Sequence, residues 1–215
     1  LFPYTTLFRS GSKNLKAIAV KGRLPLEVAK PDKFKNTALK MHKLLTEEWP
    51  AYDGISTQGT MSLFTPGAAI GWVTVNYFNS TELDLDKIGP EKFEKEFKKQ
   101  DLGCFGCPVH CGHYYSIDEG DYKGESGEGP EYETMAAIGP KCGVFEMDAT
   151  LYMTNLLNRY GLDSIDTGNA IAVLMDLNEK GYIDEGELGL DLSWGNVDTV
   201  IDLIKKIAYK KGIGE

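Results

Sequence analysis

Apolar residues recur at steps of three and four along much of the chain, the spacing that places side chains on one face of a helix. The segment after Pro31 shows this spacing first, and we expect Asp32 to cap the helix and Pro50 to stop it. Its apolar positions are Phe34, Ala38, Met41, Leu45 and Trp49. The pattern predicts an amphipathic helix over this part of the chain.

Further helical segments follow. Pro90 stands at an expected first helical position, with Phe93 and Phe97 on one face. A helix is expected over Asp148–Tyr160, with its first residue as the cap and a glycine just past its end. Another lies within "DTGNAIAVLMDLNEKG", and the last over about Val197–Lys211. The chain is therefore predicted to be mainly α.

Three segments depart from the helical pattern. Ile18–Val20, closed by Gly22, is a β-type run. A lone strand has no partner here, so we expect the rest of its sheet to lie upstream. Residues 51–72 are rich in Gly, Ser and Thr, which predicts loop with short helical or extended pieces. Residues 116–131 are polar and glycine-rich and are expected to form an exposed loop.

Composition narrows the class of protein. The chain has 215 residues, 42% of them hydrophobic and 26% charged, which is ordinary for a globular domain. Its formal net charge is −9 and it contains no basic run, so no nucleic-acid partner is expected. No apolar run approaches the roughly 20 residues of a membrane helix. The absence of a signal-peptide pattern and the clustering of cysteines favour a cytoplasmic, reducing location.

Both ends of the chain carry sequence that does not read as part of a complete domain. "PYTTLFRS", from Pro3 to Ser10, resembles the conceptual translation of a sequencing adapter. We therefore expect residues 1–10 to be an artefact of sequence assembly rather than a natural segment, and exclude them from the fold. "IAYKKGIGE" reads as a helix end followed by a connection, so we expect the chain to be cut there as well.

The strongest chemical signal is "CFGCPVHCG", in which Cys104, Cys107 and Cys111 are spaced C-x2-C-x3-C. Zinc sites usually have two separated cysteine pairs, or a pair with two histidines. A single run of three favours a [4Fe–4S] cluster with a distant fourth ligand, although zinc or free thiols also fit. Nearby candidates for that ligand are weak. His110 adjoins a ligand, His113 is expected to be a loop residue or a donor to a ligand, and a lone Cys142 suits a buried apolar position.

Two polar segments follow. In "GEGPEYET", Glu131 and Glu133 stand near Pro130, which also suits an ordinary helix start because carboxylates are favoured there. In "NRYGLDSIDTGNA", a helix ends and a new one begins among Asp and Ser residues. Free N–H groups at such a start bind anions or polar heterocycles, and plain capping by Ser164 or Asp166 is the simpler interpretation.

Taken together, these pieces resemble the tungsten-containing aldehyde:ferredoxin oxidoreductase family. "GSKNLKAIAVKG", C-x2-C-x3-CG, "EGPEYE" and "GLDSIDTG" with a helix ending "EKG" occur in the family's order and cover nearly all of the chain after residue 10. The resemblance implies a β domain followed by two helical domains. It predicts that residues 11–30 are the tail of the N-terminal, pterin-binding β domain, and that residues 31–215 form a helical domain carrying the iron–sulfur cysteines.

The resemblance also implies roles for particular residues. Cys104, Cys107 and Cys111 match three cluster ligands, and the family's fourth cysteine would lie beyond Glu215. Glu133 matches a glutamate near the tungsten that moves protons, a role that burial would favour by raising its pKa.

Other matched positions depart from the family pattern. Leu162 and Asp163 match part of the pterin-binding D-x-x-G-L-D motif, whose first aspartate is here Asn158. An E-x-x-H pair that holds a metal at the dimer interface in some members is replaced by Tyr152 and Asn155, so that metal is not expected. A homodimer through other contacts stays open.

The implied function is oxidation of an aldehyde to a carboxylate, with water as the oxygen source. The implied cofactors are a tungsten (or molybdenum) bis-pterin and a [4Fe–4S] cluster that passes electrons to ferredoxin. Two other hypotheses remain: an iron–sulfur electron-transfer subunit without pterin, and a zinc-stabilised helical binding module. The isolated 215-residue chain is expected to be inactive.

Overall fold

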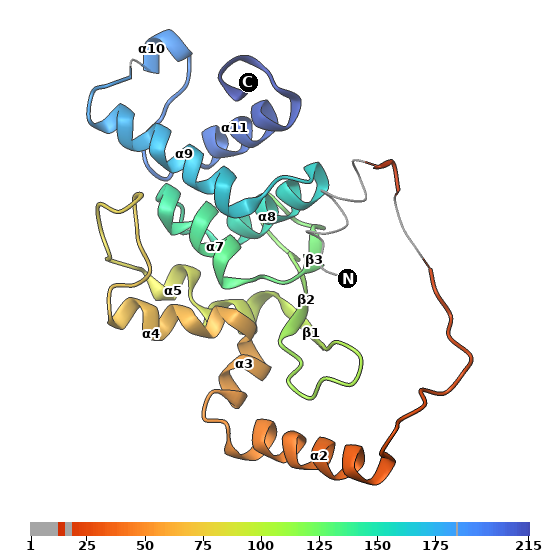
Figure 1. The fold of residues 1–215 in the computed structure, drawn as a ribbon. Helices are drawn as coiled ribbons and strands as arrows, with labels where there is room; N and C mark the ends of the chain where they lie inside the picture. Colours follow the sequence, from red (N-terminus) through yellow and green to blue (C-terminus); the bar gives the residue numbers. More distant parts are fainter. Residues whose placement is uncertain (1–12, 16–18, 184) are drawn as a thin grey trace.

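The computed structural model describes residues 13–15, 19–183 and 185–215 (Figure 1). Helices make up most of it, around one three-stranded sheet, which confirms the mainly α prediction. The artefact prediction for residues 1–10 lies outside the described residues, as does Ile18 of the predicted strand. Ala19 and Val20 are described, and they are exposed and lie outside any strand.

Helix α2 spans Pro31–Lys43 and continues as a π-helical turn, η3, over Leu44–Glu48. Lys30 occupies the position before the helix, so Asp32 does not cap it but lies in its first turn, where a carboxylate favours the helix dipole. The helical run stops before Pro50 as predicted, because Trp49 takes the extended conformation favoured before proline. No residue of α2 is buried, and the helix lies at the foot of the molecule in Figure 1.

The next stretch was predicted to be loop with short helical or extended pieces, and short helices occupy more of it than expected. It forms α3 (Tyr52–Gln58), the 3₁₀ helix η4 (Gly59–Leu63) and α4 (Phe64–Ala69). Burial accounts for the difference, because Met61 and Phe64 are completely buried in the core. Tertiary packing of these side chains outweighs the weak helix propensity of the Gly, Ser and Thr residues between them.

The chain then runs through α5 (Leu85–Ile88), α6 (Pro90–Lys92) and a π-helical turn, η5 (Phe93–Phe97). Pro90 opens α6 as predicted, and both phenylalanines of η5 are buried. An antiparallel sheet follows, in the order β1 (Lys98–Leu102), β2 (Gly112–Ser116), β3 (Ser126–Glu128). The predicted exposed loop over 116–131 therefore contains a strand, and Ile117 within it is buried.

The remaining elements are helical: α7 (Tyr132–Ile138), η6 (Pro140–Cys142), α8 (Met147–Tyr160), α9 (Ser164–Glu179), α10 (Glu185–Leu188), α11 (Val197–Tyr209) and η7 (Gly212–Gly214). Asp148 does not cap α8, since Glu146 occupies that position. Gly161 ends α8 in the left-handed conformation, as predicted, with φ of 69°. The last long helix ends at Tyr209, two residues before the predicted Lys211.

Two apolar clusters hold these elements together. One lies among α7, α8, α9 and α11 and includes Ile138, Cys142 and Met153. The other includes Phe64, Phe93, Tyr115, Met135 and Leu151, and so joins α4, η5 and the sheet to α7 and α8. Because α7 and α8 contribute to both clusters, they connect the sheet with its cysteine-containing loop to the C-terminal helices.

Candidate functional site: a cysteine hairpin beside the start of α7

The three clustered cysteines all lie in the loop between β1 and β2, which the pairing of Leu102 with Gly112 closes. The Cys107 N–H donates a hydrogen bond to the Cys104 carbonyl at 3.0 Å, and this turn contains Gly106 with φ of 73°. Cys104 and Cys111 are exposed and Cys107 is partly buried. Among the described residues, no three His, Cys, Asp or Glu side chains are already arranged to hold a metal ion.

The thiol of Cys111 lies in an unfavourable setting for a free thiolate. Although the residue is exposed, the protein around it partly desolvates the thiol and raises its pKa above the ordinary value, and the negative groups of Glu131, Cys107 and Cys104 raise it further. This setting keeps the Cys111 thiol protonated until a bound metal displaces the proton. Soft thiolate donors at this density suit iron–sulfur or zinc, so the donor chemistry fits the predicted cluster.

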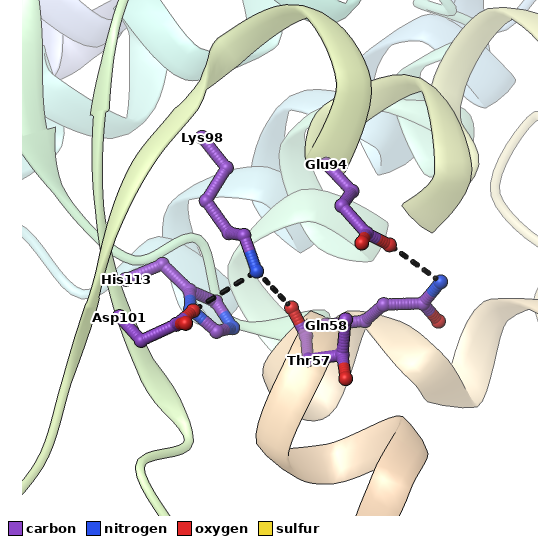
Figure 2. A network of polar contacts seen from close by, with 6 residues as sticks. All are labelled: Thr57, Gln58, Glu94, Lys98, Asp101 and His113. Atoms are coloured by element: carbon purple, nitrogen blue, oxygen red, sulfur yellow. Dashed lines mark hydrogen bonds and ion pairs between the residues drawn. The ribbon is translucent and has the colours of Figure 1, made fainter.

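A polar network supports the base of this hairpin (Figure 2). Lys98 of β1 donates hydrogen bonds to the Asp101 carboxylate at 2.9 Å and to the Thr57 carbonyl at 2.7 Å. Asp101 in turn lies 3.1 Å from Nδ1 of His113. The network thus ties both strands of the hairpin to the end of α3.

His113 is a strand residue of β2 and not a loop residue, as the structure shows. Its side chain is completely buried, and burial is the main cause that lowers its pKa. With Nδ1–H donating to Asp101, Nε2 presents a lone pair that has no hydrogen-bond partner within the described part of the chain. The imidazole therefore belongs to the support of the hairpin.

Next to the hairpin is the start of α7, where Glu131 occupies the position before the helix. The Thr60 hydroxyl donates a hydrogen bond to Glu131 Oε2 at 2.6 Å and accepts one from the Tyr132 N–H at 2.8 Å. Surrounding protein raises the pKa of Glu131, although its side chain stays accessible to water. Glu133, the predicted proton carrier, lies in the first turn of α7 and is exposed in this chain.

The predicted pterin-binding residues lie at the corner between α8 and α9. Asn158 is exposed and its carbonyl accepts a hydrogen bond from the Gly161 N–H at 3.3 Å, while Leu162 packs against the core. Asp163, rather than Ser164 or Asp166, caps α9 by accepting from the Asp166 N–H at 2.8 Å.

Contacts between helices bring these sites into one region. The hydroxyls of Thr134 and Ser164 lie 3.0 Å apart, so the start of α9 adjoins the first turn of α7 that carries Glu133. The cysteine hairpin is linked to the same helix start by two adjacent residues: Gly59 lies against the Cys111 carbonyl and Thr60 donates to Glu131. The start of α7 thus lies between the hairpin and the α8–α9 corner.

The positions matched to an interface metal have structural roles here. The Asn155 side chain is buried, accepts from the Tyr115 hydroxyl at 2.8 Å and donates to Glu125 at 3.0 Å. The Tyr152 ring stacks on Tyr122 with centroids 4.5 Å apart. Both side chains are therefore committed to contacts inside this chain.

Sequence reasoning missed Thr60, Lys98 and Asp101. A threonine in a short 3₁₀ helix and a Lys/Asp pair on a mostly exposed strand match no motif. Alternation in β2 offered the one usable signal, because His113 and Tyr115 point to the same face of the strand and both are buried.

Fold and site describe a mainly helical domain with a cysteine hairpin on its surface, and the similar proteins found are oxidoreductases. Residues 36–215 match the family "Aldehyde ferredoxin oxidoreductase, domains 2 & 3", and the chain belongs to this family. This confirms the resemblance predicted from the sequence motifs.

Two curated relatives come from Pyrococcus furiosus. A tungsten-containing aldehyde ferredoxin oxidoreductase is 32% identical over 95% of this chain and 34% of its own length. The WOR-like subunit of an aliphatic sulfonate oxidoreductase is 30% identical over 95% of this chain and 33% of its own length. The chain thus spans about a third of the length of these relatives.

A solved structure shares the fold. It is the active site complex BamBC of benzoyl coenzyme A reductase with 1,5-dienoyl-CoA, with a TM-score of 0.70 and 24% identity over 95% of this chain and 32% of that one. Separately, the described helices include none with the length and apolar character needed to span a membrane.

Proposed function

We propose that this chain is part of a tungsten (or molybdenum) pterin and [4Fe–4S] oxidoreductase that oxidises aldehydes to carboxylates and passes electrons to ferredoxin. The observation that carries the proposal is the hairpin with three thiols on one short loop, in a chain of this family. The tungsten named for the curated aldehyde-oxidising relatives supports the metal–pterin part. We assign residues 11–30 to the end of a β domain and 31–215 to a helical domain.

Cys104, Cys107 and Cys111 would hold three irons of the cluster, which when bound supplies one-electron transfer. The role of the chain is to bring three thiols together on one short loop, where each loses its proton as it binds iron. Lys98, Asp101 and His113 keep the base of that loop in place. The fourth ligand is proposed to come from outside residues 1–215.

Asn158, Leu162 and Asp163 would contact the pterin, and the bound metal–pterin would supply the two-electron oxidation of the aldehyde. One oxygen of the Asp163 carboxylate is engaged by the α9 N–H, which leaves the other free to accept from a ligand. Asn158 offers an uncharged acceptor in place of the family's aspartate and so binds the pterin more weakly.

Glu133 would accept or donate a proton at its carboxylate. It is exposed in this chain, and we propose that further parts of the enzyme cover it and exclude bulk water from it. The exposed apolar side chains of Phe34, Leu39 and Met41 on α2 offer a surface for such packing. A cytoplasmic location and a soluble ferredoxin as electron acceptor complete the proposal.

The test is anaerobic reconstitution of the 215-residue chain with iron and sulfide. We expect bound iron and sulfide and a broad visible absorption that dithionite bleaches. Replacing Cys107 by Ala should abolish them, while Cys142→Ala, which alters a buried cysteine, should not. A chain that takes up zinc and no iron–sulfur cluster would contradict the proposal and indicate a zinc-stabilised module.

A further inference from the structure

Four consecutive residues, Thr57 to Thr60, form the corner between α3 and η4, and we call them the 57–60 corner. Two of them hold elements that lead into the cysteine hairpin (Figure 2). The Thr57 carbonyl accepts from Lys98 of β1 at 2.7 Å, and the Gln58 amide donates to Glu94 of η5 at 3.3 Å. The corner is therefore attached to both the helical turn and the strand that precede the cysteines.

Gly59 brings the corner against the hairpin itself. Its φ of 60° and ψ of −153° lie in a region that is essentially restricted to glycine. A Cβ atom at this position would lie 2.6 Å from the carbonyl oxygen of Cys111 and 3.2 Å from Nε2 of His113. The lack of a side chain is what allows the backbone to pack against the last cysteine of the hairpin.

Thr60 connects the corner to the start of α7. Its hydroxyl donates to the Glu131 carboxylate at 2.6 Å and accepts from the Tyr132 N–H at 2.8 Å, so both of its hydrogen-bonding functions are used. The backbone between Gly59, which touches the hairpin, and Thr60, which holds α7, is a single peptide bond. Two adjacent residues therefore fix the distance between the Cys111 carbonyl and the first turn of α7.

We propose that the 57–60 corner positions the cysteine hairpin relative to the start of α7, and that Thr60 is its decisive positioning residue. Gly59 lies against the Cys111 carbonyl and Thr60 binds the Glu131 carboxylate, so the corner holds this carboxylate next to the hairpin. A carboxylate held beside a bound cluster opposes its reduction. The effect on a cluster rests on the proposed function. The placement of the hairpin relative to α7 is independent of that function, because it is a property of the chain without any cofactor.

The variant that tests the inference is Thr60→Val, which keeps the shape of the side chain and removes the hydroxyl. Thr60→Ser restores the hydroxyl and should restore wild-type behaviour. Thr46→Val is the matched control, because the Thr46 hydroxyl donates to the His42 carbonyl within its own exposed helical segment and to neither the hairpin nor α7. Gly59→Ala is a second, independent disruption of the same corner.

Hydrogen exchange on the chain without cofactor gives the first result. In Thr60→Val the Tyr132 amide should exchange about fivefold faster, the factor expected for one typical net hydrogen bond. Amides of the hairpin, from Gly103 to His113, should also exchange faster in Thr60→Val and Gly59→Ala. Wild-type exchange in Thr60→Ser and Thr46→Val is expected. Unchanged protection of both Tyr132 and the hairpin in Thr60→Val overturns the inference.

The second result comes from the iron-reconstituted chain. Thr60→Val should bind as much iron as the wild type, but its cluster should show a more positive midpoint potential and altered EPR g-values, and Thr60→Ser should reverse both. Wild-type potential and g-values in Thr60→Val would refute the positioning of the cluster. If the wild type binds no iron, the proposed function fails, and hydrogen exchange alone decides the role of the corner.

Discussion

The packing of α7 against α9 offers the sharpest quantitative prediction. Gly168 of α9 lies directly against the backbone of α7, where an added Cβ would be 2.4 Å from the carbonyl oxygen and 2.7 Å from the carbonyl carbon of Ala137. Gly168→Ala gains about 1 kcal/mol of helix propensity. It also forces two helices apart, and overpacking of this kind costs about 1–3 kcal/mol. Because backbone atoms cannot rotate away, we expect the upper end of that range and a net loss of about 2 kcal/mol.

Gly54 in α3 provides the matched control. A Cβ there would lie 3.6 Å from the Ser62 Cβ, an ordinary contact distance, so Gly54→Ala should retain the helix propensity gain of about 1 kcal/mol. Urea unfolding followed by far-UV circular dichroism measures the free energy of unfolding of both variants. In a thermal scan, the melting temperature should shift by about 2–4 °C for each kcal/mol in a chain of this size. Gly168→Ala as stable as Gly54→Ala would refute the close approach of α7 and α9.

Two further predictions concern cysteine reactivity and acid sensitivity. Burial raises the pKa of Cys142 to about 12. Iodoacetamide at pH 8 should therefore label the three hairpin cysteines of the folded chain and label Cys142 only after unfolding, as counted by mass spectrometry. Rapid labelling of a fourth cysteine in the folded chain would contradict this burial. The hydrogen bond from Lys98 is the main cause that lowers the pKa of Asp101. A carboxyl group whose pKa is lower in the folded state stabilises the fold at pH values above its unfolded-state pKa, and this contribution is lost as the pH falls through its folded-state pKa. Lys98→Met should therefore have a lower free energy of unfolding than the wild type at pH 7, and this difference should narrow below about pH 4. Replacing the exposed Lys95 by Met should show no such pH dependence. A difference for Lys98→Met that stays constant with pH would exclude the ion pair as its cause.

Local patterns were sufficient where a single element decides the outcome. The helices around Phe93 and Val200 were predicted from apolar spacing, and the helix ending at Tyr160 from the residues at its two ends, Gly161 among them. These features depend on contacts within one or two turns, so sequence carries them directly. The cysteine spacing likewise limits the chemistry to soft metal ions without any knowledge of the fold.

Competition between neighbouring candidates was not predictable in the same way. Asp32, Asp148 and Asp166 each stood near a helix start, yet none caps its helix. The capping position depends on where the chain enters the helix, which packing decides, and a shift of one or two residues changes the cap. Residues 51–72 became helical for a related reason, since burial of Met61 and Phe64 outweighed local propensity.

The sequence by itself determined that this chain is mainly helical, that it carries three thiols on one short segment, and that it belongs to one oxidoreductase family. Only the tertiary structure decided what surrounds those thiols. His113 became a buried support, and Gly59 and Thr60 became neighbours of Cys111 and Glu131, residues more than fifty positions away. Such contacts leave no periodic signal, because they depend on how separate elements pack rather than on the spacing within any of them.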